Sequence, residues 1–230
     1  LNETIAMTVR LGLKRIAFKD FHLALNSSPE AIREAAAKTR EAGLAAYGCG
    51  VVYMRNEAEV SQAFEYAKTA GMEMIIGVPN HDLLPLVEKK VTEYSLKIAI
   101  HNHGPGDKVY PSAATAYDLI RDLDPRIGLC IDIGHTQRLG QDPSEIFTKY
   151  AKRVHDIHIK DVSASTAQGT TVEIGRGVID IPKFLRAVIK TGYAGTLALE
   201  YEKDEGDPLP GSAESIGYLR GLLGGMGINA

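Results

Sequence analysis

The strongest constraint on the fold is a regular alternation of short apolar runs with helix-like segments. Seven runs have the length and composition of buried strands, and they cover residues 15–21, 44–49, 73–78, 97–101, 127–132, 154–160 and 196–202. The spacing between successive runs leaves room for a crossover helix and two loops, which consecutive parallel strands require. The alternation therefore predicts an α/β fold with a parallel sheet.

Capping residues mark the helices expected between these runs. Ser28 begins a segment that Gly43 closes, and Asn56 forms a capping box with Glu59. Aspartate followed by proline at 142–143, and again at 180 and 182, is typical of further helix starts. Residues 2–13 also have a helical pattern, with no strand-like run before them.

Two architectures fit this alternation, an open doubly wound sheet and a closed barrel. An open sheet that binds a dinucleotide carries a G-x-G-x-x-G turn after its first strand, and the sequence has none. Acidic and histidine side chains fall instead at the C-terminal ends of four runs, where barrel enzymes carry catalytic groups. We therefore predict a single (β/α)8 TIM-barrel domain over residues 1–230. Because only seven runs are visible, its first strand is expected upstream of residue 1.

Composition limits the classes of partner. With 230 residues, 44% of them hydrophobic, the chain can bury one substantial core. The net charge of −3 is spread along the chain, which argues against a nucleic-acid partner. No apolar stretch is long enough to cross a membrane, so a soluble protein is expected. Cytoplasmic location and export with removal of a signal peptide both stay open, as does assembly into a homo-oligomer.

Four of the predicted strands end in an acid or an imidazole. The segments IAIHNHGPG, GLCIDIGHT, VHDIHIKDV and TLALEYEKD contribute His101, Asp132, His158 and Glu200. Two imidazoles and two carboxylates form a mixed nitrogen and oxygen site that suits Mn, Co, Zn, Fe or Mg, and the two negative charges offset those of a divalent cation. The sequence therefore predicts a divalent metal site made of these four residues.

Lys160 follows His158 by two positions, so the two side chains share one face of the strand. We interpret Lys160 as a group that moves a proton or stabilises an enolate oxygen, provided that burial and the metal lower its pKa. The alternative is an ordinary ion pair with Asp156 or Asp161.

Five further residues are candidate substrate contacts. His103 and His135 lie near the predicted ligands in sequence, and His135 is alternatively a support for a ligand. Lys19 and His22 fall at the end of the first run, and Arg176 lies in the glycine-flanked segment IGRGVID. As a substrate contact, Arg176 would bind a sugar hydroxyl or phosphate; the alternative is a solvated loop arginine.

The segments HNHGPG, CIDIGHT, HIKD and LALEYE resemble the xylose isomerase-like TIM-barrel superfamily, in particular its sugar phosphate isomerase/epimerase subgroup. The resemblance covers about residues 1 to 223. In that superfamily the metal ligands are a carboxylate, an Asp, a His and a Glu, and Asp132, His158 and Glu200 match the last three. His101 stands where the family commonly has Glu. A histidine can still bind the metal, but the resemblance then lacks one of the two acid/base carboxylates of the epimerases.

The resemblance implies a metal-dependent isomerase or epimerase acting on a sugar or keto-sugar through an enediolate. Glu200 is then both a metal ligand and the base that removes a proton from the substrate. Lys160 supplies the proton that returns to the substrate or goes to the leaving group. Because His101 replaces a carboxylate, a lyase or dehydratase acting on a keto-sugar, keto-glycoside or inosose is the alternative, followed by a noncatalytic sugar-binding relative. The DNA-repair endonucleases of the superfamily are disfavoured, because their additional metal-binding histidines are missing and the net charge is negative.

Overall fold

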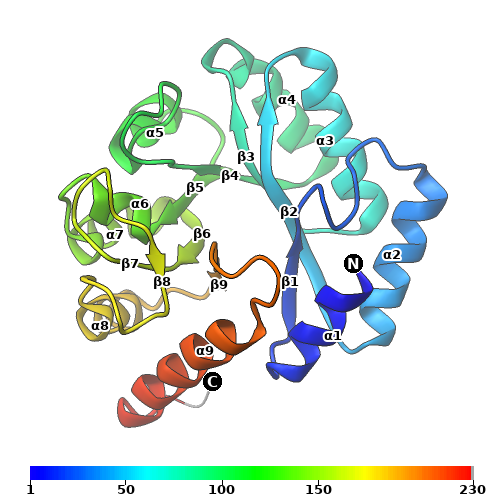
Figure 1. The fold of residues 1–230 in the computed structure, drawn as a ribbon. Coiled ribbons are helices and arrows are strands. Elements are labelled where there is room, and N and C mark those ends of the chain that lie inside the picture. The colour runs from blue at the N-terminus through cyan, green and yellow to red at the C-terminus, as the bar shows by residue number, and fades with distance from the viewer. Residues whose placement is uncertain (229–230) are drawn as a thin grey trace. The chain divides into compact units, whose positions relative to one another are not determined.

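The computed structural model describes residues 1–228, in which strands and helices alternate along the chain (Figure 1). Contacts divide the chain into two compact units. The first unit holds residues 1–101 and 116–129, and the second holds residues 102–115 and those from 130 onward. The prediction that the whole chain is one domain stays a prediction.

The first unit is built on parallel strands that follow one another in sequence order. Strands β1 (Arg15–Phe18), β2 (Ala45–Met54), β3 (Met74–Pro79) and β4 (Lys97–His101) each pair with the next. Strand β5 (Ile127–Asp132) starts beside β4. The helices of this part of the chain are α1 (Asn2–Arg10), α2 (Pro29–Glu41), α3 (Glu57–Ala70), α4 (Leu84–Tyr94) and α5 (Ala113–Ile120), with a 3-10 turn at His81–Leu83.

The capping residues act as the sequence predicts. The Ser28 side chain accepts a backbone N–H in the first turn of α2, and the Asn56 side chain accepts the N–H of Glu59 at 3.0 Å. The Glu59 carboxylate in turn accepts the N–H of Arg55, one residue before the cap. Gly71 ends α3 in the left-handed conformation with φ of 69°, which glycine adopts without strain. Local sequence therefore determines where these helices begin and end.

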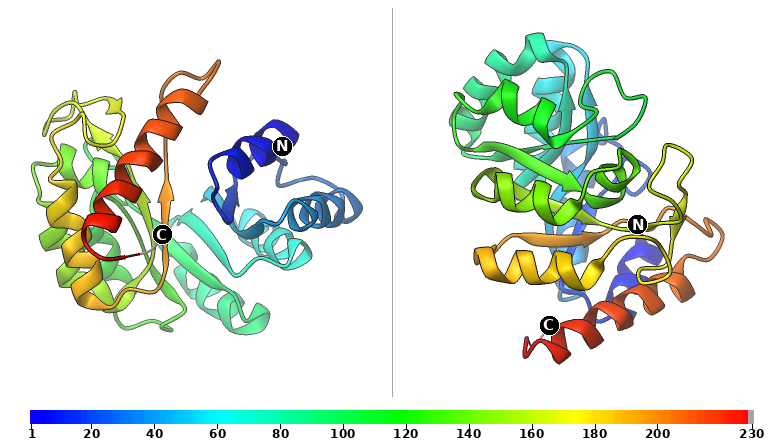
Figure 2. Two further views of the ribbon diagram at one scale, coloured as in Figure 1. Left: turned by 90° about the horizontal axis from the view of Figure 1, so that it is seen from below. Right: turned by 90° about the vertical axis from the view of Figure 1, so that its left-hand side faces the viewer.

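The second unit continues with the end of β5 and with β6 (Val154–Ile159) and β9 (Thr196–Leu199). Strands β6 and β9 are parallel, and His158 lies opposite Ala198. Two-residue strands β7 (Asp161–Val162) and β8 (Thr171–Val172) form a small antiparallel pair. The helices are α6 (Ile133–Arg138), α7 (Pro143–Tyr150), α8 (Ile181–Thr191) and α9 (Leu209–Gly225), with a 3-10 turn at Ala151–Arg153. Helices α7 and α8 pack against each other (Figure 2).

Strands β3 and β5 are buried at every position, as expected for parallel strands covered on both faces. None of the helices within residues 1–228 is long and apolar enough to cross a membrane.

Several predicted boundaries were wrong. The first strand ends at Phe18 instead of residue 21, because the chain turns at 19–22 and leaves Phe21 78% exposed. Strands β6 and β9 also end early, so Lys160 and Glu200 directly follow their strands. Strand β2 runs on to Met54, and α1 stops at Arg10. The expected strand upstream of residue 1 stays a prediction.

Candidate metal centre

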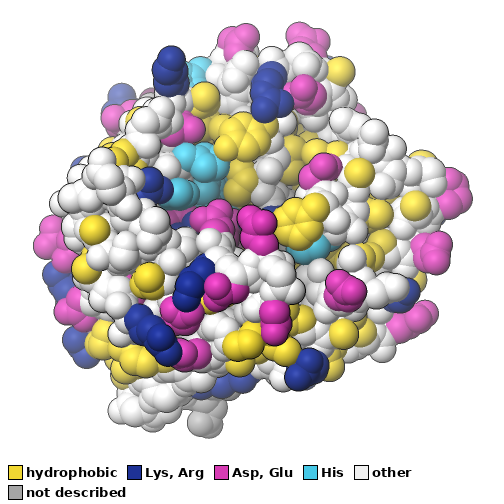
Figure 3. Space-filling view, viewed as in Figure 1, with side chains coloured by type: hydrophobic (Ala, Val, Ile, Leu, Met, Phe, Trp, Pro, Cys, Tyr) yellow, Lys and Arg dark blue, Asp and Glu magenta, His cyan; other side chains and the backbone are white. Residues whose placement is uncertain are grey.

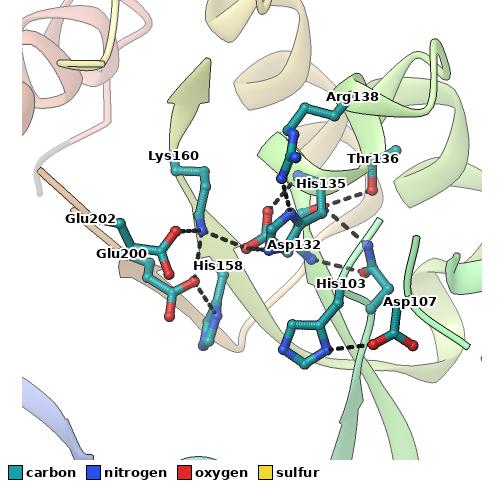
Figure 4. Close-up of polar contacts among 11 residues, drawn as sticks. His103, Asp107, Asp132, His135, Thr136, Arg138, His158, Lys160, Glu200 and Glu202 are labelled. Atoms are coloured by element: carbon teal, nitrogen blue, oxygen red, sulfur yellow. Dashed lines mark hydrogen bonds and ion pairs between the residues drawn. The ribbon is translucent and has the colours of Figure 1, made fainter. Parts of the chain in front are cut away.

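Three of the four predicted ligands come together in the second unit. Asp132 ends β5, His158 lies in β6 and Glu200 directly follows β9, and all three side chains are buried. Their candidate ligand atoms lie within 4.8 Å of one another. The amide of Glu200 donates to the carbonyl of Ile159 at 3.1 Å, which continues the pairing of β6 with β9 by one residue. The strand register therefore aligns Glu200 with Lys160, and the Glu200 side chain contacts His158 (Figure 4).

This donor set fits a divalent cation. Bonds of about 2.0–2.3 Å place the ligand atoms of one cation less than about 4.6 Å apart, which is close to the observed spacing. His158 Nδ1 and Glu200 Oε2 are already 3.1 Å apart. One imidazole nitrogen and two carboxylates suit zinc, manganese, cobalt or iron, and the carboxylates also suit magnesium. The fourth predicted ligand, His101, is the buried last residue of β4 in the first unit.

The His158 imidazole is held in its charged form when no cation is bound. Burial, the largest influence, lowers the pKa of His158, but Cys130 and Glu200 together raise that pKa well above its usual value. A proton on His158 thus offsets part of the negative charge of the cluster. A cation that binds the His158 imidazole must displace this proton.

Lys160 lies at the centre of the cluster, with 2% of its side chain exposed. Its Nζ lies 3.1 Å from Asp132 Oδ2, 3.0 Å from Glu200 Oε2 and 2.8 Å from Glu202 Oε2. The stem passes so close to Gly134 that a Cβ at this position would collide with it. A side chain at position 134 would therefore force the Lys160 stem to move.

The charge state of Lys160 is opposite to the sequence-based expectation. Burial, the largest influence, lowers the pKa of Lys160, but Asp132, Glu200 and Glu202 outweigh it and raise that pKa above its usual value. Lys160 is thus protonated in the metal-free protein. The alternative ion pair with Asp156 or Asp161 was also wrong, because the observed partners come from β5 and from the segment after β9.

Asn102 and Glu202 were not predicted as site residues. The Asn102 side chain accepts the backbone N–H of Asp132 at 3.0 Å and donates to the carbonyl of Asp132 at 3.4 Å, so it fixes the end of β5. The sequence signal for Asn102 was its position directly after the predicted ligand His101 at a strand end. Glu202 shares the alternation of Glu200, which was the corresponding signal on the last run.

His103 and His135 lie close to each other, with ring centroids 5.8 Å apart. The backbone N–H of His135 donates to Asp132 Oδ1 at 2.7 Å, and its Nε2 lies 3.9 Å from Asp132 Oδ2. His103 Nδ1 lies 3.8 Å from Asp107. Burial is the largest influence on both rings and lowers the pKa of each, so both imidazoles are neutral near pH 7. Both histidines thus offer neutral hydrogen-bonding groups beside Asp132.

Three further residues were predicted as substrate contacts, namely Lys19, His22 and Arg176. Lys19 and His22 are in the loop after β1 in the first unit, where His22 Nδ1 accepts the N–H of Lys19 at 3.0 Å. Burial lowers the pKa of His22 to about 4. Arg176 pairs with Glu214 of α9 through two hydrogen bonds of 2.5 and 2.6 Å, and both side chains are exposed. Arg176 thus contacts none of the three clustered ligands, and its role as a substrate contact stays a prediction.

Histidine side chains lie beside acidic and basic ones on one face of the molecule (Figure 3).

The sequence profile of the xylose isomerase-like TIM barrel matches residues 1–222. The chain belongs to this family. The match confirms the predicted fold class and the resemblance drawn from the four motifs.

Curated relatives of the family are distant and longer. The rhizopine catabolism protein MocC of Rhizobium meliloti is 26% identical over 145 residues, which are 56% of this chain and 44% of that protein. An inosose dehydratase of Lacticaseibacillus casei is 30% identical over 132 residues, or 50% of this chain and 43% of that protein. A 3-dehydroshikimate dehydratase of Pseudomonas aeruginosa is 30% identical over 115 residues, or 47% and 18%. The chain thus matches less than half the length of these relatives.

Solved structures share the fold at lower identity. The IOLI protein with a bound zinc atom superimposes with a TM-score of 0.78 at 16% identity, covering 98% of this chain and 93% of that one. L-ribulose 3-epimerase superimposes with a TM-score of 0.76 at 16% identity, covering 97% and 89%. These likenesses show the fold alone.

Proposed function

We propose that the protein is a divalent-metal-dependent enzyme that removes a proton next to the carbonyl group of a small keto-sugar or cyclic polyhydroxy ketone and then eliminates water. The observation that carries this proposal is the buried cluster of Asp132, His158 and Glu200 around the ammonium group of Lys160. Burying several charged groups together is costly, and such clusters concentrate at sites that bind an ion or a substrate.

His101 completes the proposed ligand set. It is bonded to Asn102, whose side chain holds the backbone of Asp132 through two hydrogen bonds. His101 ends a strand, as Asp132 does. A bound cation supplies polarisation of the hydroxyl and carbonyl oxygens of the substrate. The imidazole nitrogens favour zinc, manganese, cobalt or iron over magnesium, and a zinc atom occupies the similar IOLI structure.

Glu200 and Lys160 are the proposed proton-transfer pair. Glu200 accepts the proton from the carbon next to the carbonyl, and the electron pair forms a double bond to the neighbouring carbon. The carbon–oxygen bond at that neighbour breaks, and the departing hydroxide takes a proton from Lys160 to leave as water. Because three carboxylates surround Lys160, it holds the proton that this step needs.

Dehydration is favoured over isomerisation by two observations. His101 stands where an epimerase of the family would place its second acid/base carboxylate, and two curated relatives at 30% identity are dehydratases of ketones with several hydroxyl groups. Isomerisation or epimerisation is the second candidate, because Glu202 lies 2.8 Å from Lys160 and provides a second carboxylate beside Glu200. The proton abstraction is the same in both reactions.

Turnover assays with defined metals test this proposal. Protein stripped with EDTA and reloaded with Mn2+ or Zn2+ is incubated with an inosose and with 3-dehydroshikimate, and mass spectrometry follows the loss of water. Incubation in D2O detects exchange or isomerisation without elimination. We expect metal-restored elimination that Asp132→Asn removes and the exposed control Asp118→Asn retains. Activity that persists without metal, or in Asp132→Asn, would contradict the proposal.

A further inference from the structure

Arg138, the last residue of α6, lies beside the cluster, and none of its contacts within residues 1–228 is a carboxylate. Its Nη1 donates to His135 Nδ1 at 3.2 Å, and its Nη2 donates to the carbonyl of Ala167 at 2.7 Å. Its Nε is buried and has no acceptor within residues 1–228. Figure 4 shows the guanidinium group beside His135. A guanidinium is always charged. In the described part of the chain, the charge of Arg138 has no carboxylate partner.

Two other arginines of the chain pair with acids. Arg126 pairs with Asp124 at 2.7 Å, and Arg176 binds Glu214 through two nitrogens. Arg176, the arginine that the sequence singled out for anion binding, thus already has an anionic partner. Arg138 is half-buried and has no anionic partner in the described residues. Partial burial without a partner is less favourable for a charged group than burial in an ion pair.

The carboxylates of the proposed loaded site have partners other than Arg138. A divalent cation is balanced by Asp132 and Glu200, and the Lys160 ammonium is balanced by Glu202. His135 connects the two regions, since its amide contacts Asp132 and its ring contacts Arg138. Asp156 lies 3.9 Å from His158 Nε2. Arg138 therefore has no carboxylate contact of its own within residues 1–228, and it lies a single side chain away from a proposed metal ligand.

We propose that Arg138 binds an anionic group of the substrate, so that the enzyme acts on an acidic hydroxy-ketone in preference to a neutral one. This inference rests on the proposed function and specifies its substrate class. The anionic group is a carboxylate or a phosphate ester, since the planar guanidinium can donate two parallel hydrogen bonds to either. Hydroxyl and carbonyl oxygens of the same molecule would lie at the metal, with the anionic group turned toward α6.

Steady-state kinetics of the metal-loaded protein test the inference with three substrates. The carboxylate is 3-dehydroshikimate, the phosphate ester is a ketohexose phosphate and the neutral compound is an inosose. We expect a higher kcat/KM for one of the acidic compounds than for the inosose, and the preferred acid identifies the anionic group. Arg138→Gln should raise KM for that acid on the order of 10- to 100-fold, as expected for loss of a charge-assisted contact, with KM for the inosose unchanged. Arg138→Lys should recover part of the loss.

The control variant is Arg186→Gln, which makes the same change at an exposed position of α8. Equal loss of kcat for acidic and neutral substrates in Arg138→Gln would show that Arg138 only orients His135, and would overturn the inference. Preference of the wild type for the inosose would also overturn it while leaving the proposed function intact.

Calorimetric binding of 3-dehydroshikimate and of the ketohexose phosphate gives a readout without turnover. If neither acid is bound more weakly by Arg138→Gln than by wild type, the inference fails. If no substrate is turned over with any metal, the proposed function fails separately.

Discussion

Replacing Lys160 by Met removes a buried positive charge while keeping most of the side-chain volume. Nζ lies 3.1 Å from Asp132 and 3.0 Å from Glu200, and both carboxylates are buried. Each contact has a Coulomb energy of about 5 kcal/mol at an effective dielectric constant near 20, and desolvation of the ammonium opposes it. Breaking a buried pair costs about 3–5 kcal/mol net. The contact with Glu202 adds little, because that side chain is 51% exposed.

The metal-free variant should therefore lose about 3–5 kcal/mol of unfolding free energy, or roughly 6–20 °C in Tm for a chain of this size. A bound divalent cation replaces the missing charge, so the loss should be smaller in the loaded protein. The thermodynamic cycle then requires the variant to bind the cation more tightly, about tenfold for each 1.4 kcal/mol of difference. Turnover should fall on the order of 10²-fold or more, because the proposed proton donor is missing.

Urea unfolding in EDTA and in excess Mn2+, calorimetric titration with Mn2+ and turnover on the best substrate measure these quantities. Equal destabilisation with and without the cation would show that Lys160 does not offset the charges of the ligand carboxylates. Wild-type turnover in Lys160→Met would show that the proton travels through an imidazole or water instead.

Three further substitutions test other parts of the molecule. Glu200→Gln should abolish turnover and weaken Mn2+ binding, and unchanged affinity by calorimetry would exclude Glu200 as a ligand. Asp161→Asn should lower the unfolding free energy by roughly 2–6 kcal/mol, because one carboxylate oxygen accepts the N–H groups of Gly175 and Gly177 and an amide nitrogen cannot; a urea-denaturation change below about 1 kcal/mol would refute this role. His22→Gln should flatten the loss of stability between about pH 6.5 and 4. Since burial lowers the pKa of folded His22 to about 4, the unfolded chain binds the proton first as pH falls, and identical pH profiles for variant and wild type would contradict this.

The order of strands and helices could be predicted because several helix boundaries have a local chemical cause. Asn56 caps α3 through its own side chain, and Gly71 ends the helix through its own backbone conformation. The end of β1 could not be predicted in this way. The apolar character of Phe21 indicated burial, yet the turn closed by Lys19 and His22 exposes that ring. Apolar patterning reports which side chains tend to be buried, and it carries little information on where the backbone turns.

The same distinction applies to the candidate site. The types of ligand at the strand ends could be predicted, because alternation along one strand is a local property. The partners of Lys160 could not, since they depend on pairing between strands. The acids nearest in sequence, Asp156 and Asp161, are not its partners. Glu200 and Glu202 are its partners, although they lie 40 and 42 residues away in the chain.

The register of pairing between strands β6 and β9 is the physical reason why the partners of Lys160 could not be predicted from the sequence. Strands β6 and β9 align Ile159 with Leu199, so the next positions, Lys160 and Glu200, lie side by side. A slip of one residue would turn Glu200 to the opposite face and bring Tyr201 next to Lys160. The buried ammonium would then lose a carboxylate partner, and the proposed cation would lose a ligand. The charged cluster therefore stabilises one register of β9 over its neighbours, so the groups proposed for catalysis also help to specify the fold that positions them.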